Sequence, residues 1–73
     1  MALDDDKGRL VDTVEAAKLL LLSPRTLEGM RFNAQGPRYI KLGTGARAKV
    51  VYRISDLDAW LDQNTRKPGN DSL

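Results

Sequence analysis

The 73-residue sequence contains no cysteine and no histidine. Without cysteine, the chain has no disulfide framework and no zinc finger built on thiolate ligands. Without histidine, it lacks the commonest metal ligand and the usual general base near neutral pH. Ser23 and Ser55 fit helix caps better than nucleophiles, because no histidine is present to activate either hydroxyl. We therefore expect no catalytic residue, no metal site, no cofactor and no enzyme activity.

Long apolar runs are also missing. The longest run, Leu19–Leu22, is far shorter than the roughly 18 residues that a membrane-spanning helix needs. No basic segment is followed by the apolar stretch of a signal peptide. We expect a cytoplasmic protein that does not contact a membrane.

The middle of the chain has almost no acidic residues. Between Ser23 and Arg53 only Glu28 is negative, whereas the acids gather near the two ends, in 4–6 and 56–62. The cations of this middle segment are Arg25, Arg31, Arg38, Lys41, Arg47, Lys49 and Arg53. Although the net charge is only +2, a basic middle between acidic ends is typical of a surface that binds a polyanion.

A short helix is predicted over Ser23–Asn33. Ser23 is a favourable N-cap residue, and Pro24 suits the first helical position, where its missing N–H costs nothing. Leu27 and Met30 are three residues apart and share one apolar side. The other side is polar and mainly basic, so this helix has one buried and one exposed face.

Another helix is predicted just before it, over about Val14–Leu21, with Asp12 or Thr13 as its cap. Its expected buried side consists of Ala16, Ala17, Leu19 and Leu20. Leu21 stands where glycine usually follows a helix end, so we expect mild strain or a different helix end there. Two short helices joined so tightly, the second with a basic outer face, are typical of a helix-turn-helix DNA-binding protein.

A β-hairpin and a third helix are predicted next. Tyr39–Leu42 and Val50–Tyr52 have strand composition, and a glycine-rich turn joins them. Ser55 is the expected cap of a helix over Asp56–Gln63, with Leu57, Trp60 and Leu61 buried. The other residues assigned to the core are Leu27, Met30, Tyr39 and Tyr52. The sum is an α+β, mostly helical fold: a winged helix-turn-helix over 10–63, with a disordered acidic arm (1–9) and a flexible tail (64–73).

Several motifs of the chain together resemble the MerR-like excisionase and AlpA families. They are Thr13–Ala17 (TVEAA), Leu19–Leu20, Ser23–Leu27 (SPRTL), Gly36–Gly43 (GPRYIKLG), Tyr52–Arg53 and Ser55–Leu61 (SDLDAWL). The chain departs from the family pattern at Leu21, where glycine is usual, at Met30, where tryptophan is usual, and in a longer wing turn, 44–49. The resemblance implies a small DNA-binding protein of a phage or integrative element.

The residues expected to contact DNA fall into two groups. The recognition helix contributes Ser23, Arg25, Thr26, Glu28, Gly29 and Arg31. The wing and the phosphate contacts contribute Arg38, Lys41, Thr44, Gly45, Arg47, Lys49 and Arg53. Arginine can bind guanine through two hydrogen bonds, and glutamate can accept one from cytosine N4. Gly29 permits close approach of the helix backbone to the DNA.

Three functions remain open from the sequence. The resemblance implies an excisionase, or recombination directionality factor, that bends attachment-site DNA and promotes excision of a mobile element by a site-specific integrase. A transcriptional regulator of AlpA type would use the same fold. A protein–protein adaptor that has lost DNA binding is disfavoured by the basic middle of the chain. The expected partners are double-stranded DNA in the bacterial nucleoid, an integrase, and further copies of the protein along the DNA, since one small module binds with limited affinity.

Overall fold

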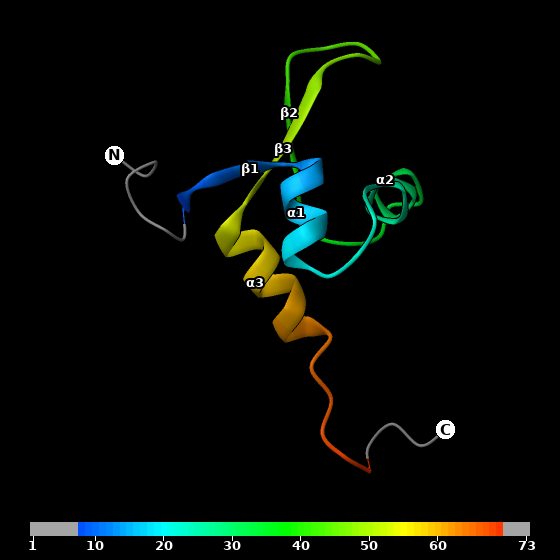
Figure 1. Ribbon diagram of the computed structural model, residues 1–73, viewed down its shortest axis with the longest axis vertical. Coiled ribbons are helices and arrows are strands. Elements are labelled where there is room, and N and C mark those ends of the chain that lie inside the picture. Colours follow the sequence, from blue (N-terminus) through cyan, green and yellow to red (C-terminus); the bar gives the residue numbers. More distant parts are fainter. Residues whose placement is uncertain (1–7, 70–73) are drawn as a thin grey trace.

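The computed structural model describes residues 8–69. Along this part of the chain the elements are β1 (Leu10–Asp12), α1 (Thr13–Leu19), α2 (Pro24–Phe32), β2 (Ile40–Leu42), β3 (Lys49–Arg53) and α3 (Ile54–Gln63). The strands form one antiparallel sheet in the order β1-β3-β2. The predicted α+β class is confirmed (Figure 1). Most of the predicted acidic arm and the last residues of the predicted tail lie outside the described residues.

The first strand, β1, was not predicted from the sequence. Val11 lies opposite Tyr52 in the antiparallel register of β1 and β3. Beyond the strand pair, the Ile54 N–H donates to the Arg9 carbonyl over 3.0 Å. Unlike β2, this short segment runs directly into a helix and has no turn that would join it to a neighbouring strand as a hairpin. Only the pairing with β3 therefore makes this segment a strand.

The starts of α1 and α2 follow the predicted capping chemistry. Asp12 is the cap of α1, and its carboxylate accepts from the Glu15 N–H over 2.8 Å. The Ser23 hydroxyl caps α2 by accepting from the Thr26 N–H over 3.0 Å, with Pro24 at the first helical position. The connection between the two helices consists of residues 20–23 alone.

One residue after the C-cap of each of these helices, the chain adopts the left-handed conformation. Leu21 has φ 60° and Ala34 has φ 57°. After α1, the Leu22 N–H donates to the Ala17 carbonyl over 2.8 Å, and the Leu21 N–H donates to the Lys18 carbonyl over 3.1 Å. This pair of bonds defines the Schellman motif, which normally places glycine at the left-handed position. The unusual leucine noted in the sequence thus ends α1 in a geometry that favours glycine.

The predicted cap of α3 is wrong. The helix begins at Ile54, one residue before Ser55, and its N-cap is Arg53, which makes no side-chain capping bond. The reason is that β3 runs directly into α3 while the Ile54 N–H is bound by the Arg9 carbonyl. The sheet, rather than a serine cap, therefore sets the start of α3.

The core is a small cluster between the sheet and the three helices. It contains Val11, Ala16, Ala17, Leu27, Tyr52 and Leu57, which confirms the predicted members Ala16, Ala17, Leu27, Tyr52 and Leu57. Met30 and Trp60 are half-buried. Leu19, Tyr39 and Leu61, also predicted to be buried, are between 45% and 48% exposed. A domain of this size has too little interior to cover every apolar side chain. None of the helices within 8–69 is long and apolar enough to cross a membrane.

Candidate nucleic-acid interface

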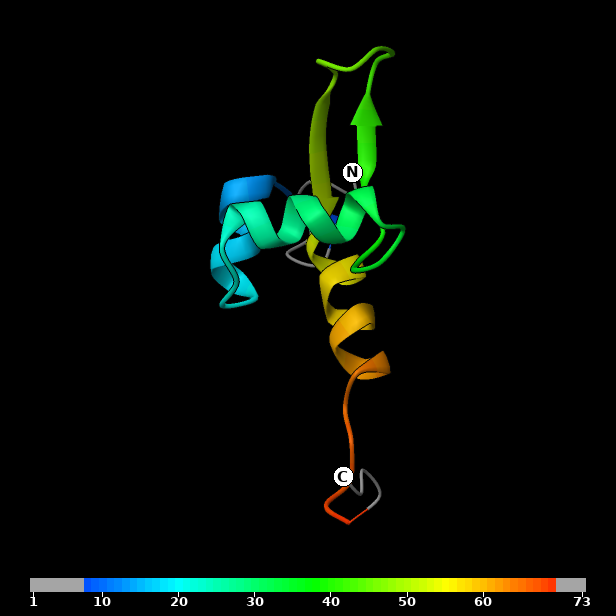
Figure 2. The same ribbon diagram turned by 90° about the vertical axis from the view of Figure 1, so that its right-hand side faces the viewer.

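The outward face of α2 is the first part of the candidate site. Residues spaced by four and seven lie on one face of a helix, so Arg25, Gly29 and Phe32 line up on the side opposite the fully buried Leu27. Thr26 and Glu28 flank this line and are exposed. We call these five outward residues the α2 outer face. In Figure 2, α2 runs across the front of the molecule, with the hairpin rising on one side and α3 descending on the other.

Gly29 lies at the centre of the α2 outer face, above open space. A Cβ atom added at this position would meet no other atom within 4 Å. Glycine inside a helix costs about 1 kcal/mol relative to alanine. Packing within the described part of the chain therefore does not require glycine here, and the position is free for close approach of another molecule.

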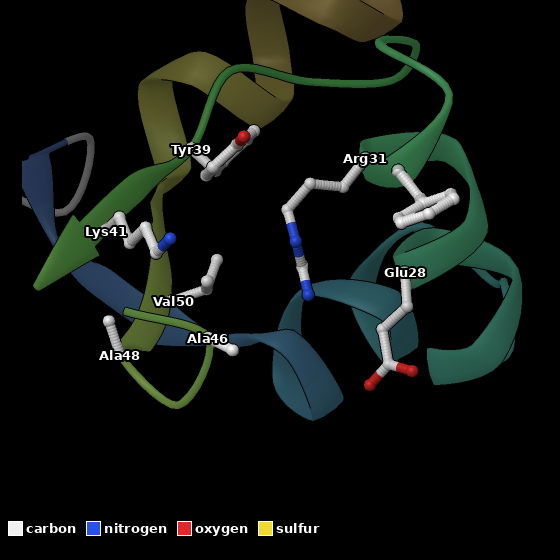
Figure 3. Close-up of a pocket in the computed structure, with 8 residues that line it drawn as sticks. Glu28, Arg31, Tyr39, Lys41, Ala46, Ala48 and Val50 are labelled. Carbon is white, nitrogen blue, oxygen red and sulfur yellow. The ribbon is translucent and has the colours of Figure 1, made fainter. Parts of the chain in front are cut away.

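Arg31 takes a different position from the one expected. Its guanidinium donates to the Tyr52 hydroxyl over 2.8 Å and to the Thr13 hydroxyl over 3.4 Å. It also lies 5.6 Å from the centre of the Tyr39 ring, within cation–π range. Figure 3 shows the side chain extending from α2 toward Tyr39. Arg31 thus connects α2 to β3 and α1, whereas the sequence grouped it with the base-contacting residues.

A cleft of about 560 Å³ separates α2 from the β2–β3 hairpin. Its lining residues are Glu28, Arg31 and Phe32 of α2 and Tyr39, Lys41, Ala46, Ala48 and Val50 on the hairpin side (Figure 3). Lys41 pairs with Val50 across β2 and β3, and side chains of paired residues lie on the same side of a sheet. The register therefore turns Lys41 toward α2, so two cations and one anion line the cleft.

The hairpin loop presents the next group of predicted residues. Thr44, Gly45 and Arg47 are exposed in this loop, and Lys49 is exposed at the start of β3. Gly45 has φ 92°, a conformation that favours glycine. In Figures 1 and 2 the hairpin projects away from α3. The loop thus carries its basic side chains beyond the body of the domain.

Arg38 and Arg53 lie apart from the hairpin tip. Arg38 is exposed beside a second hollow, of about 430 Å³, which the end of α2 and the segment 34–39 form together. Arg53 is at the opposite end of β3 from Lys49, about 13 Å away at strand spacing. Its guanidinium lies 3.8 Å from the Asp56 carboxylate. The structure therefore does not bring Arg53 together with the hairpin loop.

Phe32 belongs to the candidate site but was not singled out in the sequence. Its side chain is 92% exposed, and it lines both the cleft and the second hollow. Its position gave a usable signal, because it is three residues after Gly29 and seven after Arg25, on the polar side of the predicted helix. An exposed phenylalanine in that row is an exception to the amphipathic pattern.

Within 8–69 there is no group of three or more acidic side chains placed to hold a metal ion. No family model matches the chain. A search of curated proteins likewise finds no match. The geometry of α2, the cleft and the hairpin is therefore what supports a functional assignment.

Proposed function

We propose that the protein is a winged helix-turn-helix that binds double-stranded DNA, with α2 in the major groove and the β2–β3 hairpin as the wing. One observation carries the proposal: the α2 outer face, with its open position at Gly29, and the exposed basic hairpin lie on either side of one cleft. A helix in one groove and a wing in the next would straddle a phosphate backbone. Lys41 in the cleft supplies positive charge for that backbone.

The roles of the residues follow from their positions. Arg25 would donate two hydrogen bonds to a guanine, Glu28 would accept from cytosine N4, and Thr26 would contact a neighbouring base edge or phosphate. Gly29 would let the helix backbone approach the bases. Arg31, held by Tyr52 and Thr13, would orient α2 rather than contact a base. Ser23, whose hydroxyl caps α2, would set where the helix begins.

The remaining cations would hold the DNA backbone. Arg47 and Lys49, with Thr44 and Gly45, would meet the adjacent minor groove or its phosphates. Arg38 and Lys41 would contact phosphates near the cleft, and such contacts position a protein without specifying sequence. Arg53 would contribute least, because it lies near Asp56 and far from the hairpin tip.

The biological role we propose is that of an excisionase, on the basis of the resemblance to that family. Several copies bound to neighbouring sites would bend an attachment region and favour integrase-mediated excision. Bending 20–30 base pairs costs on the order of 1–6 kcal/mol, which several bound copies can supply. The alternative is a transcriptional regulator with the same fold, which would act on a promoter without an integrase.

The DNA-binding proposal is tested by comparing Arg25→Ala with Arg47→Ala. Arg25 is on the α2 outer face, so its loss should weaken binding to the preferred sequence by about 1–3 kcal/mol and relax sequence preference. Loss of Arg47 in the hairpin loop should weaken preferred and random duplexes about equally. Competition binding on both kinds of duplex measures the difference. Equal effects on preference would show that the assignment of helix and wing is wrong.

The excisionase role is tested in a recombination assay. Purified integrase and attachment-site DNA from the same mobile element are incubated with and without the protein, and excised product is quantified. Stimulated excision supports the proposal. If excision is unchanged while a neighbouring promoter responds to the protein, the regulator alternative is correct. If the protein binds no duplex DNA, both roles fail and the adaptor remains.

A further inference from the structure

Phe32 is the most exposed large apolar side chain of α2. It is 92% exposed, although it lines both the cleft and the second hollow. Burying a phenylalanine side chain normally stabilises a folded protein. Because Phe32 is almost fully exposed, the fold gains no such stabilisation from it. The position next to it along the helix face, Gly29, is empty of side-chain atoms.

The charges around Phe32 indicate which kind of molecule would cover it. Arg25 shares its helix face, Arg31 and Lys41 line the same cleft, and Arg38 lines the second hollow. Glu28 is the one anion of the cleft lining. A mainly cationic surround attracts a polyanion and repels the same surface of a second copy. Nucleic acid therefore fits this position better than another molecule of the protein.

A major groove offers few apolar groups to a phenyl ring. Among the four bases, only thymine presents an apolar group there, its C5-methyl, and phenylalanine is one of the side chains that contact it. The absent side chain at Gly29 allows the groove floor to come close to the helix. The ring of Phe32 would then project into the groove beside that opening.

We propose that Phe32 determines sequence specificity by contacting the C5-methyl group of a thymine. The inference rests on the proposed function and deepens it. Arg25 and Phe32 are seven residues apart, or about 10 Å along the helix axis. At 3.4 Å per base step along the duplex axis, the thymine lies at most about three base pairs from the guanine that Arg25 contacts, and closer if α2 follows the slant of the groove.

The test begins with selection of preferred sites from a random duplex library by the wild-type protein. Each thymine of the selected site is then replaced by deoxyuracil, which removes only the methyl group. At one thymine, wild-type binding should weaken about fourfold, the equivalent of one buried methyl group at about 0.8 kcal/mol. Phe32→Ala should show no sensitivity to that replacement, whereas Phe32→Leu, which stays apolar, should retain part of it.

Leu61→Ala is the matched control, because Leu61 is an exposed apolar residue of α3. The helix α3 extends away from the hairpin, on the other side of α2 (Figure 2). Leu61→Ala should keep the full sensitivity, and circular dichroism should show all variants folded. Three results overturn the inference: no thymine is sensitive, Phe32→Ala keeps the same sensitivity, or Phe32→Ala alters only cooperativity between adjacent copies. If the wild-type protein enriches no sequence and binds no duplex, the proposed function itself fails.

Discussion

Leu21 and Ala34 occupy left-handed positions at the ends of α1 and α2, where most helices place glycine. After α2, the Gln35 N–H donates to the Met30 carbonyl over 2.7 Å, and the Ala34 N–H donates to the Arg31 carbonyl over 3.2 Å. The second helix therefore ends in the same Schellman motif as the first. A residue with a Cβ in this conformation costs roughly 1–2 kcal/mol.

Replacing either residue by glycine should stabilise the protein. We expect Leu21→Gly and Ala34→Gly each to raise the free energy of unfolding by about 0.5–1 kcal/mol, since relief of backbone strain exceeds the added entropy of the unfolded chain. Urea denaturation measures the change. The matched control is Ala59→Gly on exposed α3, which should lower stability by about 1 kcal/mol. A loss of stability in Ala34→Gly similar to that of the control would contradict the strain argument.

Replacing Gly29 should change stability and DNA binding in opposite directions. Gly29→Ala should stabilise the folded protein by about 0.5–1 kcal/mol, because the added methyl group meets nothing and helix propensity improves. The same methyl group should weaken DNA binding by filling the opening on the α2 outer face. Thermal unfolding and a binding titration of one preparation test both halves. Improved stability with unchanged affinity would mean that DNA does not approach Gly29.

At the scale of elements, α2 is tied to the sheet through Arg31. Its guanidinium reaches Tyr52 of β3, the central strand of the sheet. The Tyr39 ring, whose centre lies 6.3 Å from that of Tyr52, flanks the guanidinium. Tyr52 is 1% exposed, so its hydroxyl is an acceptor held in a fixed place. The bond therefore sets the position of α2 relative to the hairpin across the cleft.

Removing the hydrogen bond between Arg31 and Tyr52 should weaken the attachment of α2 to the sheet. Tyr52→Phe removes only the hydroxyl and should lower the free energy of unfolding by about 1 kcal/mol. Combining it with Arg31→Leu should reveal a coupling of about 0.5–1 kcal/mol in a double-mutant cycle. Tyr39→Phe makes the same chemical change on a ring that keeps its face toward Arg31, so its effect should be smaller. Strictly additive effects of Tyr52→Phe and Arg31→Leu would show that the two side chains do not hold the elements together.

At the scale of the whole molecule, the charge is divided along the chain and in space. Arg25, Arg38, Lys41, Arg47 and Lys49 are exposed on α2, the hairpin and the segment between them, while Asp56, Asp58 and Asp62 lie on α3. The other exposed cations of the described chain are Arg9, Lys18, Arg53, Arg66 and Lys67. In Figures 1 and 2, α3 extends to the side away from the hairpin. The net charge of +2 therefore understates the basic character of one side of the molecule.

This division predicts a strong salt dependence of DNA binding. The exposed cations of the proposed interface are Arg25, Arg38, Lys41, Arg47 and Lys49. If about 4–6 phosphates are neutralised, the logarithm of the binding constant should fall against the logarithm of salt concentration with a slope of roughly −4 to −5. Titrations at several salt concentrations measure it, and Lys49→Gln should make the slope shallower by about 0.9. A flat response would remove the DNA-binding proposal.

The sequence by itself determined the local structure of this protein. Ser23 with Pro24 marked the start of one helix, and Asp12 or Thr13 marked the start of the other, because capping depends on neighbouring residues alone. The structure shows that Asp12 is the cap. Leu27 and Leu57 were recognisable as core residues from helical spacing. The α+β class and the hairpin followed from composition over a few residues. Such features depend on short-range chemistry, which a sequence displays directly.

Only the tertiary structure decided the features that depend on pairing between distant segments. Leu10–Asp12 became a strand through β3, more than 35 residues away along the chain, and that pairing moved the start of α3 ahead of Ser55. Arg31 looked like one more cation of an exposed face until Tyr52 and Thr13 appeared within hydrogen-bond distance. Phe32 looked like an ordinary apolar residue until the packing left it uncovered. The burial of a side chain and its hydrogen-bond partners depend on which distant segments pack against it. The periodicity of a single helix or strand does not contain that information.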